Sequence, residues 1–317
     1  MDTQNSKAMY RDISAYKAGN TGIDYVHHFD SGLPGPHLLI SSLIHGNEFC
    51  GMHAVTHLLD SGVRPARGKL TLTMANVEAY ESFDESTPFA SRQLVHNLNR
   101  IWSDEYLQGE SDSPEVRRLR ELAPFMDAAD HILDIHSTSL DVPPFWVYPD
   151  AQRNTSLAEA IDVCGLHLIM PKGLGSGTPL IQFRRFGDAA TTQGAAVVIE
   201  CGQHFKPSSA KVAIAAATQF LAHFGLIDAA QAEWLAGVQA QPSARRRFEL
   251  VETHVVQTTE FRFSRPVVGF EVFSKDELVA TDGDKQIVAP FDGCTVIMPT
   301  REPIVGREAM YLARERA

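Results

Sequence analysis

The chain has 317 residues, of which 44% are hydrophobic and 21% are charged, a composition typical of globular proteins. Its net charge of -11 argues against a protein that binds the nucleic-acid backbone or an anionic membrane surface. No apolar run approaches the ~20 residues of a membrane-spanning helix, and four widely spaced cysteines without a Cys-x-x-Cys pair favour reduced thiols in a cytoplasmic protein.

Short apolar runs alternate with helical patterns over the first two thirds of the chain. Strand–helix alternation of this kind is typical of an α/β sheet with helices on its faces. Ser113 and Pro114 have the residue types of a helix N-cap and first turn. The pattern predicts strands at 37–44, 69–75, 131–135, 145–149, 167–171 and 195–200, and helices at 49–61, 113–126 and 208–224.

The pattern changes after a polar, arginine-rich stretch at 239–247, which we interpret as a linker. The remaining sequence is rich in Val, Phe and Thr and has turn signals roughly 8–12 residues apart, which is typical of all-β structure. We therefore predict an α/β catalytic domain over residues 1–243 and a small C-terminal β domain over residues 244–317.

Three metal-ligating side chains follow predicted buried strands. His45 and Glu48, in the motif HGNE, lie where the first predicted strand gives way to a helix, and His136 ends the strand at 131–135. Functional groups gather at the carboxyl ends of strands in open α/β sheets. Two imidazoles and one carboxylate suit zinc and leave a fourth position for water. Asp134 is a candidate to orient a ligand ring, although strand alternation does not settle where it points.

A carboxylate also ends the apolar strand AAVVIE, at Glu200. Burying this group is costly unless it has a partner or a task, and beside a metal-bound water it would serve as general base and then as general acid. Taken singly, each of these residues has an ordinary interpretation as a surface charge, a structural histidine or an ion-pair partner. Their coincidence at three strand ends favours a metal site.

These motifs, together with Asn99-Arg100 in NLNRIW and DIHST at 134–138, resemble the succinylglutamate desuccinylase/aspartoacylase family, relatives of the zinc carboxypeptidases. The resemblance implies a mixed central sheet flanked by helices and a C-terminal β domain that caps the active site. It also implies one zinc ion per chain, with His45, Glu48 and His136 as its ligands.

The resemblance further assigns roles around the metal. It implies that Glu200 is the catalytic carboxylate and that Arg92 polarises the scissile carbonyl and its oxyanion. Asn99 and Arg100 would hold the substrate carboxylate, and Tyr311 would reach the active site from the C-terminal domain.

Two positions depart from the aspartoacylase pattern. A second substrate-binding arginine is expected ten residues before Glu200, where this chain has Ala190, and an expected tyrosine is replaced by Phe186. We consider Arg184 and Arg185 as replacements. Two further features stay open: the glycine-rich loop at 173–179, as a pocket element or an ordinary turn, and His204, as a site contact or a structural histidine.

The sequence therefore predicts a zinc-dependent hydrolase that cleaves the amide bond of a small N-acyl amino acid or N-acyl amine. The expected partner is this small molecule, with neither nucleic acid nor membrane, and a homo-oligomer is compatible with the sequence. Two alternatives are a metallocarboxypeptidase acting on short peptides and a non-catalytic binding protein on the same fold.

Overall fold

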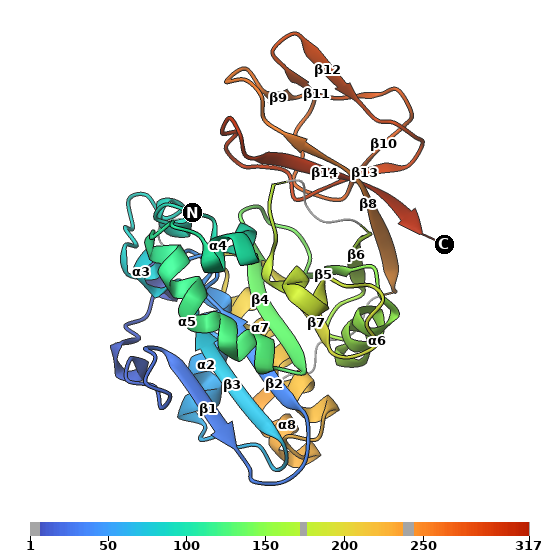
Figure 1. Ribbon diagram of the computed structural model, residues 1–317. Coiled ribbons are helices and arrows are strands. Elements are labelled where there is room, and N and C mark those ends of the chain that lie inside the picture. The colour runs from blue at the N-terminus through green and yellow to red at the C-terminus, as the bar shows by residue number, and fades with distance from the viewer. Residues whose placement is uncertain (1–6, 172–175, 237–243, 317) are drawn as a thin grey trace.

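The computed structural model describes residues 7–171, 176–236 and 244–316. One mixed sheet runs through both the N-terminal and the C-terminal part of the chain (Figure 1). In spatial order its strands are β1 (Val26–Asp30), β3 (Lys69–Met74), β2 (His37–Ser42), β4 (His131–Thr138), β7 (Ala195–Gln203), β5 (Phe145–Pro149), β6 (Leu166–Met170), β8 (Arg246–Val255), β14 (Glu308–Arg316), β13 (Cys294–Ile297) and β10 (Glu271–Phe273).

The centre of the sheet is parallel. Strands β3, β2, β4 and β7 run in one direction, whereas β1 at the edge is antiparallel to β3 and β5 is antiparallel to β7. The carboxyl ends of β2, β4 and β7 therefore lie side by side along one rim of the sheet, across the strand direction, which is where such sheets bind ligands. This arrangement confirms the α/β fold and its mixed central sheet.

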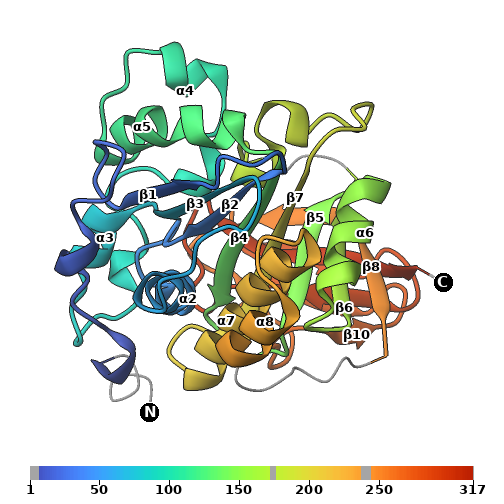
Figure 2. The same ribbon diagram turned by 90° about the horizontal axis from the view of Figure 1, so that it is seen from below.

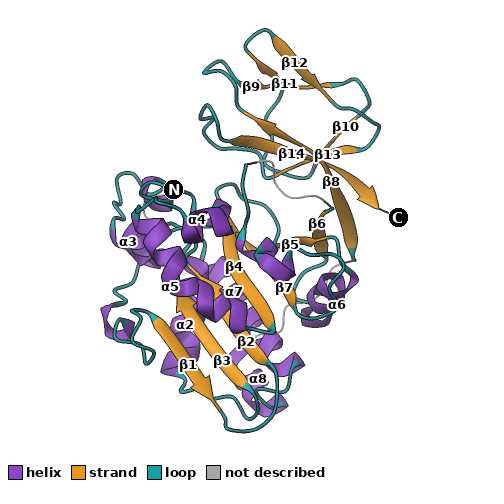
Figure 3. Cartoon of the chain, viewed as in Figure 1, coloured by secondary structure: helices purple, strands orange, loops and turns teal. Residues whose placement is uncertain are grey.

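The helices cover both faces of this sheet (Figures 2 and 3). Those on one face are α2 (Phe49–Asp60), α6 (Gln152–Ile161), α7 (Pro207–His223) and α8 (Ala229–Ala236), and those on the other are α4 (Asp104–Gln108) and α5 (Pro114–Ala128). The short α3 (Val77–Glu81) follows β3. Of the helices in the described ranges, none is long and apolar enough to cross a bilayer.

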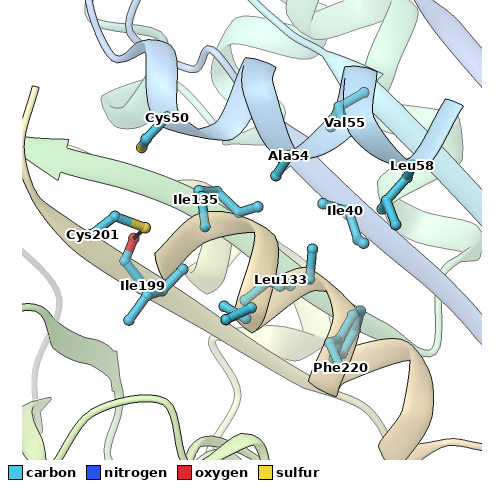
Figure 4. Close-up of a cluster of buried hydrophobic side chains, with 14 of the residues drawn as sticks. Ile40, Cys50, Ala54, Val55, Leu58, Leu133, Ile135, Ile199, Cys201 and Phe220 are labelled. Atoms are coloured by element: carbon cyan, nitrogen blue, oxygen red, sulfur yellow. Dashed lines mark hydrogen bonds between the residues drawn. The ribbon is translucent and has the colours of Figure 1, made fainter. Parts of the chain in front are cut away.

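The central strands are buried on both faces, so their alternate side chains enter two separate cores. Ile40, Leu133 and Ile199 pack toward α2 and α7, where they form the cluster drawn in Figure 4. Ile132 and Val198 point to the opposite face and pack in the core that contains side chains of α5. The strands consequently read as continuous apolar runs, as expected for parallel strands covered on both sides.

Local sequence signals set the start of α5, whereas β4 extends beyond its predicted end. The hydroxyl of Ser113 accepts a hydrogen bond from the Val116 backbone N–H, and Pro114 opens α5 as predicted. The strand predicted at 131–135 continues as β4 through Thr138, so His136 lies within the strand.

The C-terminal part is all-β, as predicted, but it is not a separate layer. Its first strand, β8, pairs in parallel with β6 and so extends the central sheet, and β14, β13 and β10 follow it antiparallel. A second sheet packs above this part and consists of β12 (Lys285–Val288), β11 (Leu278–Asp282) and β9 (Arg262–Phe263). The predicted domain boundary stays a prediction, and residues 237–243 of the predicted linker lie outside the described residues.

A buried carboxylate ties this small sheet to β8. Asp282 accepts hydrogen bonds from the backbone N–H groups of Gln257 and Thr258, at 2.7 and 2.8 Å, and from the Thr258 hydroxyl at 2.7 Å. The His254 ring lies 3.0 Å away. Burial alone would raise the pKa of Asp282, but these hydrogen bonds lower it to about 2.

We expect Asp282→Asn to lower the free energy of unfolding by about 2 kcal/mol at pH 7, the scale of hydrogen bonds to a charged group. Because the folded-state pKa of Asp282 is depressed, its stabilisation is full above the unfolded pKa of about 4 and disappears as pH falls toward 2. Urea denaturation at pH 7 and pH 3 measures both effects. Asp284→Asn, an exposed aspartate in the same turn, is the matched control, and an equal loss at both pH values would contradict this account.

Candidate metal centre and active site

The three predicted metal ligands converge at the carboxyl edge of the sheet. His45 and Glu48 follow β2, His136 lies on β4, and one ligand atom from each is within 4.8 Å of the others. The Nδ1 atoms of His45 and His136 lie 2.8 and 2.9 Å from the two oxygens of the Glu48 carboxylate. All three side chains are buried, so residues far apart in the sequence form one enclosed donor set.

The electrostatics of this donor set suit a cation. Burial lowers the pKa of His45 to about 4, which leaves the neutral imidazole that a metal ligand must be. Burial would also lower the pKa of His136, but the carboxylates of Asp134 and Glu48 raise it above its ordinary value. The cluster thus stabilises positive charge between its carboxylates, and two imidazoles with one carboxylate fit zinc.

Outer contacts hold both imidazole ligands. The Nε2 atom of His136 lies 2.8 Å from the buried carboxylate of Asp134, which settles the direction of that side chain. The Nε2 atom of His45 lies 3.0 Å from the side-chain oxygen of Asn97. Such contacts fix the orientation of a ligand ring. Sequence reasoning missed Asn97, whose only local signal is that of an N-cap before Asn99.

Glu200 lies directly opposite His136 in the pairing of β4 with β7. Its side chain is buried, and its Oε2 atom has no hydrogen-bond partner in the described residues. Burial raises the pKa of Glu200 to about 8. A carboxyl group with one unpartnered oxygen beside a metal-binding cluster is suited to carry a proton.

Gly46 of the HGNE motif explains how Arg92 comes to this cluster. A Cβ atom at position 46 would lie 2.4 Å from the Ser91 carbonyl oxygen, so only glycine permits this approach. The Gly46 N–H donates to the Arg92 carbonyl at 3.0 Å. The Arg92 guanidinium then lies 3.0 Å from both Glu48 Oε1 and His45 Nε2, two of the candidate metal ligands.

Glu115, at the start of α5, positions the segment that follows Arg92. This fully buried carboxylate accepts hydrogen bonds from the backbone N–H groups of residues 94–96, the shortest at 2.6 Å. From sequence alone Glu115 reads as an acidic residue in the first turn of a helix, so its contribution to the site was not predicted.

Of the remaining predicted residues, Arg100 and Tyr311 link the N-terminal and C-terminal parts of the chain. The Asn99 side-chain oxygen accepts from the Leu180 N–H at 3.0 Å and is therefore used within the fold. Arg100 forms an ion pair with Glu308 of β14, at 2.6 Å, and the Tyr311 hydroxyl donates to the same carboxylate at 3.0 Å. Tyr311 thus lies beside Arg100, and their roles toward a substrate stay predictions. Glu308 was not predicted.

Arg184 and Arg185 lie elsewhere. Arg184 pairs with Asp127 at 2.7 Å, and Arg185 donates to the backbone carbonyls of Asp127 and Ala129. These partners precede β4, at the edge of the sheet opposite the metal ligands. Neither arginine replaces the group missing at Ala190.

His204 contacts the residue that follows a metal ligand. Its Nδ1 atom lies 2.8 Å from the Ser137 hydroxyl, and the Ser137 N–H donates to Glu48 Oε2 at 3.2 Å. Burial lowers the pKa of His204 to about 3, so the ring is neutral. Of the loop at 173–179, residues 173–175 lie outside the described residues.

Fold and site together define an α/β protein with a candidate metal centre in which three protein ligands leave a coordination position open. A family model, the succinylglutamate desuccinylase/aspartoacylase catalytic domain, matches residues 34–224. The chain therefore belongs to the succinylglutamate desuccinylase/aspartoacylase family, which confirms the resemblance inferred from the motifs.

Individual relatives are distant but match over most of their length. The chain is 23% identical to a succinylglutamate desuccinylase of Vibrio vulnificus, over 88% of this chain and 80% of the relative. It is 26% identical to the succinylglutamate desuccinylase of Erwinia tasmaniensis, over 86% of this chain and 82% of the relative.

Solved structures share the fold. The structure of succinylglutamate desuccinylase from Vibrio cholerae has a TM-score of 0.67 at 19% identity and covers 92% of this chain and 86% of its own. The structure of the ectoine utilization protein from Ruegeria pomeroyi has a TM-score of 0.62 at 15% identity. It covers 94% of this chain and 92% of its own.

We expect Asp134→Asn to weaken zinc affinity about 10- to 100-fold, because the amide no longer holds the His136 ring as a carboxylate does. Competition with a chromophoric chelator measures the affinity. Asp141→Asn, an exposed aspartate that pairs with Lys206, is the control for loss of a negative charge after the same strand. An unchanged affinity in Asp134→Asn would show that His136 does not depend on this contact.

Proposed function

We propose that this protein is a zinc-dependent hydrolase that cleaves the amide bond of a small N-acyl amino acid or N-acyl amine. The observation that carries the proposal is the buried Glu200 carboxyl, with its unpartnered oxygen, opposite His136 in the His45–Glu48–His136 cluster. The desuccinylases among its relatives support an N-acyl substrate.

The protein's own residues account for the proton transfers. When bound, zinc supplies a Lewis acid that acidifies water and polarises the scissile carbonyl. Glu200 takes a proton from the attacking water and delivers it to the leaving nitrogen, so one group serves as base and then as acid. The products are a carboxylate and a free amine.

Arg92 stabilises the charge that develops on the substrate oxygen. A guanidinium is a permanent planar donor, and fixed donors directed at a developing oxyanion contribute several kcal/mol. Asp134 and Asn97 keep the two imidazoles in place during the reaction, since each contacts the ring nitrogen that faces away from Glu48.

We expect Glu200→Gln to lower kcat about 10²- to 10⁴-fold, the usual contribution of a positioned acid–base group, while the protein keeps its zinc. Initial rates over a panel of N-acyl amino acids, with zinc content measured on the same samples, check this. Glu252→Gln, an exposed glutamate on β8, is the matched control. Full activity in Glu200→Gln, or after removal of the metal by a chelator, would overturn the mechanism.

The same panel decides between the proposal and its alternatives. A metallocarboxypeptidase would share the metal cluster but would turn over short peptides in preference to N-acyl amino acids. A non-catalytic binding protein would turn over neither. The presence of the ligand set, Glu200 and Arg92 in one place favours a catalyst over that last alternative.

A further inference from the structure

The Arg100–Glu308 pair is linked to the candidate metal cluster through one short turn of the chain. Asn97, which contacts the metal ligand His45, begins the same turn that carries Arg100. Glu308 comes from β14 of the C-terminal part, and its neighbour Tyr311 is close enough to Arg92 for that guanidinium to lower the tyrosine pKa, although burial raises it overall. A substrate bound between Arg92 and the C-terminal part would therefore meet this pair.

The polar atoms of both side chains in the pair already have hydrogen-bond partners. Arg100 Nε and Nη2 lie 3.1 and 2.6 Å from the two Glu308 oxygens, in the forked arrangement that guanidinium and carboxylate prefer. Arg100 Nη1 donates to the Asn99 carbonyl at 2.8 Å. Glu308 also accepts hydrogen bonds from the hydroxyls of Ser176 and Tyr311. Each nitrogen of the guanidinium thus has a partner, and both carboxylate oxygens are used.

The surrounding backbone keeps Arg100 in this position. The Thr178 N–H donates to the Arg100 carbonyl at 2.9 Å, and a Cβ at position 177 would lie 2.3 Å from the same carbonyl. Gly177 has a φ of +135°, which favours glycine. The side chains of Arg100 and Glu308 are only 13% and 18% exposed, so solvent screens the pair weakly.

The residues that the sequence offers for a second substrate carboxylate do not supply one. Arg92 faces the metal cluster, Arg184 and Arg185 are at the opposite edge of the sheet, and position 190 is alanine. A carboxylate that faces the pair would meet a guanidinium that is already neutralised and the negative charge of Glu308 itself.

We propose, resting on the function proposed above, that the Arg100–Glu308 pair makes this site select N-acyl substrates that present no carboxylate to the pair. The part of the substrate that faces the pair is uncharged or cationic. Glu308 is thus a specificity-determining residue supplied by the C-terminal part of the chain, and it disfavours dicarboxylates because like charges that lie close together are costly.

The test uses two substrates of nearly equal shape. For the zinc-loaded protein, kcat/KM for N-acetyl-L-glutamine is expected to exceed that for N-acetyl-L-glutamate at least about tenfold, which corresponds to about 1.4 kcal/mol. Glu308→Gln frees Arg100 and is expected to shift this ratio at least about tenfold toward the glutamate substrate. Glu260→Gln, an exposed glutamate of the C-terminal part, is expected to leave the ratio unchanged.

Binding of the free amino acids gives a readout that does not need turnover. Calorimetry on the zinc-loaded protein is expected to show tighter binding of L-glutamine than of L-glutamate, and Glu308→Gln is expected to reduce or reverse this order. A wild-type preference for glutamate in both assays, or a folded Glu308→Gln protein with the wild-type ratio, would overturn the inference. Absence of turnover together with the expected binding order would instead overturn the proposed deacylase activity and support the charge selection.

Discussion

The Glu48 carboxylate is the group on which the site depends, because its two oxygens hold the two imidazoles together. Each oxygen faces the Nδ1 atom of one histidine, at 2.8 and 2.9 Å. Three buried ionisable groups would be costly if they were separate, but they satisfy one another here. This requirement explains why β2 and β4 must be adjacent and parallel: only that order brings residues 45–48 and His136 to one point at the edge of the sheet.

The sequence predicted those parts of the protein that depend on local pattern. Apolar runs identified the central strands, and His45 and Glu200 near their carboxyl ends identified the edge where the candidate site lies. The Ser113-Pro114 pair located the start of α5 because a cap acts within one turn. Family resemblance added Arg92, whose position beside the cluster depends on the close approach at Gly46, a contact that a sequence does not display.

Groups that act across long sequence separations could not be predicted. Asn97 and Glu115 resemble helix-start residues, and their contacts with His45 and with the backbone at Leu94 form only in the folded chain. Glu308 lies 208 residues after Arg100 and reads as an ordinary strand residue. The connection of β8 to β6 was missed for the same reason, since a change in composition shows where strands begin but not which neighbour they pair with.

That connection has a mechanical consequence. Because β8 pairs directly with β6, the C-terminal part is joined to the body by backbone hydrogen bonds as well as by the covalent chain. It cannot swing away as a hinged lid without breaking this ladder. A protein truncated before β8 would expose the bare edge of β6, a template for association with other chains. The C-terminal part therefore protects the edge of the central sheet from association with other chains.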